Sequence, residues 1–400
     1  MNTLRPQNGL SLIELMIALV IGSLLMLGLV QVFSASRAAY QLSEGLARVQ
    51  ENARFAIDYM QRDLRMVGHL GCVSDQTRFM STPAGFHSAF VAQTRPSEAQ
   101  LAAAPEPIQF HVSVQGFEAT GTGPGGAVTL PASGAWSGAP ALPDYIKNLV
   151  PAPAAGSDIV VVRYFSGEGA PLSSYTSGAS TALTVDKAHW DMALAPGIGA
   201  SDPAMFGVAD CVGAVAFQAS QIENAGGSVK LTVNQSGLNQ SSLITDNFAL
   251  GQAMLYRAVS EAFYIASRPD GTPGLYRARF GSTAGGTAMT PQVEELVRGI
   301  ENMQLIYGMD SQTDPGRAPT GFIASQMVAD KVQTGSSTLP WRRVGLIQVA
   351  LMSRANDPSS AIAPSEIPRL LGVQVAPPAD SRYRAVYETT IAMRNRLYGN

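Results

Sequence analysis

The chain has 400 residues, with 27 basic and 30 acidic side chains and a net charge of −3 at pH 7. This length is sufficient for a buried core in one large domain or in two smaller ones. The basic residues are few and unclustered, which argues against binding to nucleic acid or to an anionic membrane surface. The 39 glycines and 25 prolines indicate many turns and suit an exported protein.

The N-terminal segment has the composition of a membrane-spanning helix. Residues 1–8 are polar with one charge, Arg5, and Gly9 follows them. From Leu15 to Ser36 there are 22 uncharged residues, which as a helix would be about 33 Å long and would cross the hydrocarbon of a bilayer. The one acid, Glu14, lies at the start of this run, where a carboxylate in hydrocarbon requires a partner.

The stretch Gly9-Leu10-Ser11-Leu12-Ile13-Glu14 resembles the class III leader of type IV prepilins. The resemblance implies that the prepilin peptidase cuts after Gly9 on the cytoplasmic side and N-methylates the new terminus, Leu10, while the apolar segment is retained. Two simpler alternatives are an ordinary secretory signal, cleaved near residues 34–36, and a plain membrane anchor. A signal core is shorter and rarely carries a carboxylate, so the prepilin interpretation is favoured.

Residues 37–67 continue the helix in amphipathic form. The apolar residues recur at spacings of three and four and form one stripe: Leu42, Leu46, Val49, Ala53, Ile57, Met60, Leu64 and Val67. Charged residues lie on the opposite side. No proline occurs between Leu10 and Val67, so we predict one helix of 58 residues, about 87 Å long, that ends at Gly68 and Gly71.

The remaining residues, 68–400, have the pattern of a β-rich head with a loop-rich insertion at 74–157. The insertion contains several runs rich in glycine and proline, which interrupt regular structure. Ile108–Val114 is its one predicted strand. Further strands are predicted at 156–164, 183–185, 212–218, 229–233, 253–265, 276–280, 303–309, 344–352 and 384–397, with a short helix at 294–298. Short connections favour antiparallel pairing, so the predicted fold class is α+β, a long helix packed on an antiparallel sheet.

Several local motifs resemble the PilW-type minor pilins of type IV pilus systems. They are Glu51–Ala56, Arg62–Gly68 closing on Gly71-Cys72, Ser157–Arg163, Leu296–Met303 leading to Tyr307–Asp310, and Arg384–Arg396. The resemblance implies a pilin-like organisation: a leader at 1–9, a transmembrane and filament-core helix at 10–36, an amphipathic continuation at 37–67 and the head at 68–400.

The two cysteines, Cys72 and Cys211, form an even pair in a chain expected to be exported. Such a pair predicts a disulfide, and nothing around either residue has metal-ligand spacing. Two separate buried thiols are the alternative.

No pattern in the sequence indicates catalysis. The four histidines share no metal-like spacing, and neither a nucleophile elbow nor a paired-histidine zinc motif occurs. The turn at Asp310–Asp314 resembles the start of a calcium loop but lacks glycine at the sixth position and glutamate at the twelfth. We therefore expect no enzyme activity, no cofactor and no metal, and a polar turn at residues 310–314.

The family resemblance gives Glu14 its expected role. In pilin filaments this glutamate lies against the terminal amine of a neighbouring subunit, here equivalent to Leu10, and sets the axial register. The implied function is that of a minor pilin in the complex that primes and caps the pilus. Its implied partners are the prepilin peptidase, the other minor pilins, the major pilin, a tip adhesin and, before assembly, inner-membrane lipid.

The chain is accordingly expected to cross the inner membrane once with its head in the periplasm, and later to reach the extracellular tip of the pilus. Two other functions are considered. A J-type pseudopilin of type II secretion shares the leader and general fold, but such proteins are typically shorter. A membrane-anchored surface-binding module would use the loops of residues 74–156 for recognition.

Overall fold

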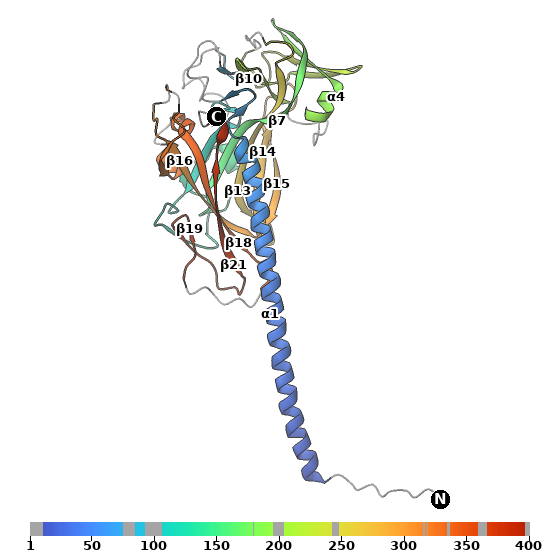
Figure 1. The fold of residues 1–400 in the computed structure, drawn as a ribbon, viewed down its shortest axis with the longest axis vertical. Coiled ribbons are helices and arrows are strands. Elements are labelled where there is room, and N and C mark those ends of the chain that lie inside the picture. The colour runs from blue at the N-terminus through green and yellow to red at the C-terminus, as the bar shows by residue number, and fades with distance from the viewer. Residues whose placement is uncertain are drawn as a thin grey trace, which may run out of the picture.

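The computed structural model describes residues 11–74, 85–92, 106–178, 180–194, 204–241, 248–314, 317, 319–333, 337–358 and 366–396. One long helix, α1 (Leu12–Met66, 55 residues), precedes a β-rich head. Its second half lies along the head, while its first half projects away from it (Figure 1). This is the predicted α+β architecture, and the predicted helix of 10–67 is confirmed from residue 12 onward.

The predicted apolar stripe of α1 is the face that packs on the head. Val49, Ala53, Met60 and Leu64 are fully buried, whereas Leu42 at the upstream end is exposed. Ala56 and Asp63 also lie on this face. The helix ends where Gly68 adopts a left-handed φ of 78°, a conformation that glycine takes without strain.

The strands of the described residues form two main sheets. In the larger, twelve-stranded sheet the central path runs β11–β12–β8–β7–β13–β9–β10–β3, β14 pairs with β13 and β15, and β4 pairs with β7 and β6. The bounds of its strands are β3 (Gly85–Ser88), β4 (Val114–Ala119), β6 (Gly138–Ala139), β7 (Ile159–Thr176), β8 (Thr181–Asp186), β9 (Met205–Ala209), β10 (Gly213–Gln218), β11 (Gln221–Ala225), β12 (Ser228–Val233), β13 (Met254–Ser267), β14 (Pro273–Gly281) and β15 (Thr290–Arg298).

The second sheet has the order β17–β16–β18–β21, with β16 (Ile300–Asp310), β17 (Ile323–Met327), β18 (Val344–Arg354) and β21 (Arg384–Ala392). Two small sheets complete the head: β1 (His69–Leu70) with β2 (Val73–Ser74), and β19 (Arg369–Leu370), β20 (Val373–Ala376) and β5 (Ala127–Thr129). Short helices are η2 (Glu106–Ile108), α3 (Asp144–Lys147), α4 (Lys187–His189), η3 (Trp190–Leu194), α5 (Ala329–Val332), η4 (Leu339–Arg343) and η5 (Arg394–Arg396). Pairing is antiparallel as predicted, except that β10 with β3 and β20 with β5 are parallel.

The main hydrophobic core lies where α1 meets both large sheets. Met60 and Leu64 of the helix pack with Val160 and Val162 of β7 and with apolar residues of β16 and β18. Truncating a buried side chain of this size to alanine typically costs about 2–5 kcal/mol. The core therefore holds the second half of α1 firmly on the head.

The predicted strand at 108–114 is wrong. Residues 106–108 form η2 instead, and the strand β4 begins only at Val114. The cause is Arg163, a fully buried side chain on β7 whose guanidinium donates to the carbonyl oxygens of Glu106, Pro107 and Val112 at 2.7–3.2 Å. Because a buried guanidinium requires acceptors, this segment turns its carbonyl groups toward Arg163 and cannot form a regular ladder.

The predicted helix at 294–298 is also wrong, since these residues belong to the strand β15. Glu294 lies opposite Arg277 of β14 in the register, and the two side chains form an ion pair. Glu295 in turn binds Arg268 at 2.8 Å. These charge pairs and the neighbouring strand β14 outweigh the local helix propensity of two glutamates and a leucine.

The other predicted strands coincide with β7, β8, β10, β12, β13, β14, β16, β18 and β21, although several are longer than expected. The last one ends at Ala392, before η5, and Leu397 lies outside the described residues. The 74–157 region contains β3 to β6, η2 and α3, while its residues 75–84 and 93–105 also lie outside the described part.

A buried charge cluster connects α1 to the twelve-stranded sheet. Asp63 on the helix binds Arg277 of β14 at 2.7 Å, and both side chains are about nine-tenths buried. Glu261 of β13 lies behind them at 3.8 Å from Arg277 and also accepts from Tyr164 at 2.9 Å. Burial and the charge of Asp63 raise the pKa of Glu261 to about 7, although Arg277 and Arg279 oppose the shift.

We predict that Asp63→Ala lowers the free energy of unfolding of the head by about 3 kcal/mol, because it removes one partner of a buried ion pair. The matched control is Asp58→Ala on the same helix, where the pair with Arg54 is exposed and 3.9 Å long, so a change within about 0.5 kcal/mol is expected. Denaturant unfolding of the detergent-solubilised protein, followed by the fluorescence of the head tryptophans, measures both. Equal midpoints for the two variants would contradict the assigned role of Asp63.

Candidate assembly interface

The first half of α1 is an unpartnered apolar surface. From Leu12 to Phe33 the large apolar side chains are each 52–77% exposed, and the helix is long and apolar enough to cross a membrane. Apart from Glu14, this stretch has no charged residue. Exposed leucine, isoleucine and valine over such a length require either lipid or other helices as their environment. This surface is the part of the chain best suited to assembly.

Glu14 lies at the N-terminus of α1 and takes part in a capping box. Ser11 is the N-cap, and its hydroxyl accepts from the amide of Glu14 at 3.3 Å. In return, Oε2 of Glu14 accepts from the amide and the hydroxyl of Ser11, each at 3.1 Å. Such caps typically stabilise a helix by about 0.5–2 kcal/mol. The carboxylate is thus held at the helix start by its own chain.

The predicted cleavage residues, Gly9 and Leu10, lie outside the described residues. The structure begins at Ser11, which would be the second residue of a chain cut after Gly9. The capping role of Ser11 was missed in the sequence analysis. The signal was nevertheless present, because Ser-Leu-Ile-Glu matches the pattern of serine followed three positions later by glutamate before an apolar run.

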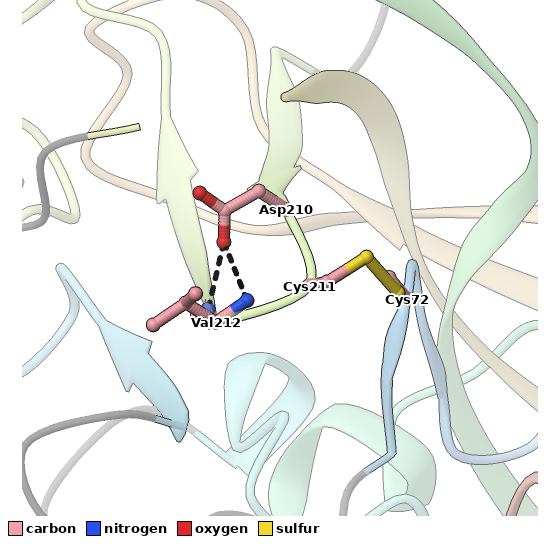
Figure 2. The surroundings of a disulfide bond; sticks show 5 residues. Cys72, Asp210, Cys211 and Val212 are labelled. Atoms are coloured by element: carbon pink, nitrogen blue, oxygen red, sulfur yellow. Dashed lines mark hydrogen bonds between the residues drawn. A yellow bond between two sulfur atoms is a disulfide. The ribbon is translucent and has the colours of Figure 1, made fainter. Parts of the chain in front are cut away.

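The predicted disulfide between Cys72 and Cys211 is present and lies immediately after α1. Cys72 occupies the turn between β1 and β2, and Cys211 the turn between β9 and β10. Figure 2 shows how Asp210 shapes the second turn: its Oδ1 accepts from the amides of Val212 and Gly213 at 2.8 and 2.9 Å. Both turns are thereby held at the surface of the head, where the cysteines are exposed.

Gly71 allows the two turns to approach so closely. Its φ is +77°, and an added Cβ would lie 2.7 Å from the Cβ of Ala209. The neighbouring His69 ring nitrogen Nδ1 lies 2.8 Å from the carbonyl oxygen of Phe165 on β7. The exit of α1 is therefore joined to the twelve-stranded sheet by close packing, a hydrogen bond and a covalent bond.

The acidic turn at 310–314 is organised by hydrogen bonds. Asp310 accepts from the amides of Gln312, Thr320 and Gly321, at 2.7–3.0 Å, and from the hydroxyl of Thr320 at 3.0 Å. Its carboxylate is thus engaged in holding the connection between β16 and β17. Within the described residues there is no group of three His, Cys, Asp or Glu side chains that could hold a metal ion.

We predict that replacing both cysteines by serine lowers the free energy of unfolding by about 2–4 kcal/mol, because the bond closes a loop with a sequence separation of 139. Both positions are exposed, so the change leaves no cavity, and the single variants should lose as much stability as the double one. Denaturant midpoints of the oxidised wild type and the three variants check this. Equal midpoints for wild type and double variant would contradict it.

Comparisons with known families match both ends of the chain. A family model described as "Type IV Pilus-assembly protein W" matches residues 262–395, which run from β13 through η5 and include the whole four-stranded sheet. A second model, the "Prokaryotic N-terminal methylation motif", matches residues 4–30 and so includes Gly9, Leu10 and Glu14. Comparison with curated proteins and with solved structures gives no match. Together with the projecting apolar helix, the two family matches are those of a PilW-type type IV pilin with a class III prepilin leader, and they support a part for the chain in type IV pilus biogenesis.

Proposed function

We propose that this protein is a minor pilin that joins other minor pilins in the complex that primes pilus assembly and then occupies the pilus tip. The observation that carries the proposal is the exposed apolar half of α1, with a single carboxylate at its start and a rigid attachment to the head at its end. A helix of this kind is stable in lipid before assembly and among other helices afterwards.

The register of assembly is assigned to Glu14. After cleavage behind Gly9, the methylated amine of Leu10 in one subunit would lie against the Glu14 carboxylate of its neighbour. Between apolar helices each of these charges is costly alone, whereas the pair offsets the loss of hydration at one axial position. The capping box supports this role, because it fixes where the Glu14 carboxylate lies relative to the start of its own helix.

The size of the head supports a terminal position. In a filament built by stacking α1 helices, each head must fit beside the heads above and below it. This head has two main sheets, and their strands extend well beyond the width of α1 (Figure 1). A subunit at the tip has no neighbours above it and can accommodate such a head. The head would face the periplasm before assembly, with the prepilin peptidase, the major pilin and a tip adhesin as further partners.

The alternatives are less well supported. The match to the pilus-assembly family favours the pilus over a pseudopilin of type II secretion. A surface-binding module with a plain anchor would not require a carboxylate at the start of its membrane segment.

Processing gives the first test. Mass spectrometry of the mature protein should find an N-methylated terminus at Leu10. Gly9→Val should leave the full-length precursor in the membrane, because the scissile backbone must approach the peptidase closely. Gly22→Ala is the matched control, since an added Cβ there meets nothing within 4 Å. A mature chain that begins near Arg37 would instead identify an ordinary signal peptide.

Three substitutions separate the pairing role of Glu14 from its capping role. Glu14→Gln retains a side chain that can close the capping box but removes the charge, whereas Ser11→Ala removes the cap and retains the charge. If Glu14 pairs with a neighbouring amine, Glu14→Gln and Glu14→Leu should both deplete the subunit from the minor-pilin complex, since losing one partner of a buried pair costs about 3–5 kcal/mol. Ser11→Ala should be tolerated much better, with an effect of about 1 kcal/mol.

The measurement is co-purification with the other minor pilins from crosslinked membranes, together with a count of surface pili. Equal membrane levels of each variant are the required control, because removing an acid from hydrocarbon should, if anything, favour insertion. Wild-type incorporation of the Leu variant would show that Glu14 does not set the register.

A further inference from the structure

The head contains a pocket of about 920 Å³ at the junction of its two main sheets. One side is formed by the end of β4, the turn that follows it and β6, and the other by Ile306 of β16, the end of β17 and the start of α5. The pocket lies in the head, whereas the assembly surface described above is the projecting half of α1. It is therefore separate from the function proposed for that helix.

A buried carboxylate that lines this pocket has one unpaired oxygen. Glu118 is only 5% exposed, and its Oε1 accepts from the hydroxyl of Thr122 at 3.2 Å. Its Oε2 is buried with no hydrogen-bond partner. Asp330 of α5 has the same arrangement: Oδ2 accepts from Lys331 at 2.9 Å, while Oδ1 is buried and unpartnered. A buried acceptor without a donor is destabilising, and more so when it is charged, and a ligand with donors would remove that cost.

The ionisable groups around Glu118 define the charge of the pocket. Asp158 lies behind it and uses both oxygens to accept from the amides of Ala119 and Leu305, each at 2.9 Å. Lys331, whose side chain is 68% exposed, is the one basic residue that lines the pocket. Burial chiefly, together with the charge of Asp330, raises the pKa of Glu118 to about 7, against the opposing effects of Thr122, the backbone amide of Ala329 and Lys331.

The walls of the pocket are apolar. Pro124, Ile306, Met327, Val328 and Leu371 line it next to the two carboxylates. The volume greatly exceeds that of a metal ion, and the described residues offer no set of three metal-ligating side chains. Apolar walls that lead to buried carboxylates are complementary to a cation carried on an aliphatic stem, as in arginine and lysine side chains.

Among the residues that the structure describes, one rim of the pocket is the unpaired edge of a sheet. The strand β17 is terminal in the order β17–β16–β18–β21, and its residues Gln326 and Met327 line the pocket. Phe322, next to the start of β17, is 69% exposed. An extended segment could pair with this edge and direct every second side chain toward the pocket.

We propose that this pocket binds a guanidinium or ammonium group on an aliphatic stem, through Glu118 and Asp330. Such a group can come from an arginine or lysine side chain in an extended segment of another protein, or from a free alkylamine. The free edge of β17 favours the extended segment as the source.

The test is calorimetric titration of the detergent-solubilised full-length protein with three probes: agmatine, the peptide acetyl-Thr-Val-Arg-Val-Thr-amide, and the same peptide with Gln in place of Arg. We expect agmatine and the Arg peptide to bind and the Gln peptide to bind at least about tenfold more weakly. Tighter binding of the Arg peptide than of agmatine assigns the site to a protein segment, and the reverse assigns it to a free amine. Equal binding of the two peptides, or no binding of either cation at about 10 mM, would overturn the proposal.

Variants of the pocket supply the controls. Glu118→Gln should weaken agmatine binding by about tenfold or more, whereas Glu168→Gln, an exposed acid on β7, should leave it unchanged. Lys331→Met should strengthen binding, because it removes the competing cation at the rim. If Glu118→Gln does not fold, Asp330→Asn at the more exposed acid provides the same comparison. Wild-type affinity in every acid variant that folds would overturn the assignment.

The pH dependence gives an independent readout. A bound cation favours the ionised form of Glu118, so binding should release a proton and should strengthen between about pH 6 and about pH 8. Titrations in buffers with different ionisation enthalpies measure the number of protons released. No proton release near pH 7 would mean that Glu118 is not the group that receives the cation.

Discussion

The orientation of α1 on the head depends on the ion pair between Asp63 and Arg277. Apolar packing alone tolerates small rotations of a helix, because dispersion forces have little directional preference. A buried carboxylate bound to a guanidinium does not tolerate them, since each charge would lose its partner in a medium that hydrates neither. The pair therefore fixes the rotation of α1, and with it the direction in which the exposed apolar half presents Glu14. Glu261 and Glu294 also bind Arg277, and Arg279 in turn binds Glu261.

The elements that could be predicted from sequence are those whose pattern is local. The α1 helix and its stripe could be predicted because the uncharged run of residues 15–36 continues, without a proline, into a stripe of helical periodicity that ends at Val67. The capping box of Ser11 and Glu14 could also have been predicted, because the two residues lie within four positions of each other. The β-branched strands β7 and β18 were found for the same reason. Their lengths were underestimated, because the neighbouring strands that extend them are distant in sequence.

The failures are cases in which distant residues decide the local structure. Nothing in residues 108–114 shows that Arg163 will bind a carbonyl group of this segment, and nothing in 294–298 shows that Arg277 of β14 will lie opposite Glu294. The pocket is a further example, because Glu118 and Asp330 are brought together only by the docking of two sheets. The sequence pattern did not single out Asp63 either, because its partner Arg277 lies 214 positions further along the chain.

The position of the disulfide has a mechanical consequence. When a pull on α1 is resisted by any part of the head beyond residue 211, the force passes from Cys72 directly to Cys211 through the covalent bond. The residues between them, which include β3 to β9, then lie outside the path of the load and cannot be unravelled by it. Tension enters instead at the turn before β10, inside the twelve-stranded sheet, where it must separate β10 from both β9 and β3. The disulfide therefore strengthens the junction between α1 and the head. Without it, a pull on the helix would unfold the strands of the head one after another, starting from β1.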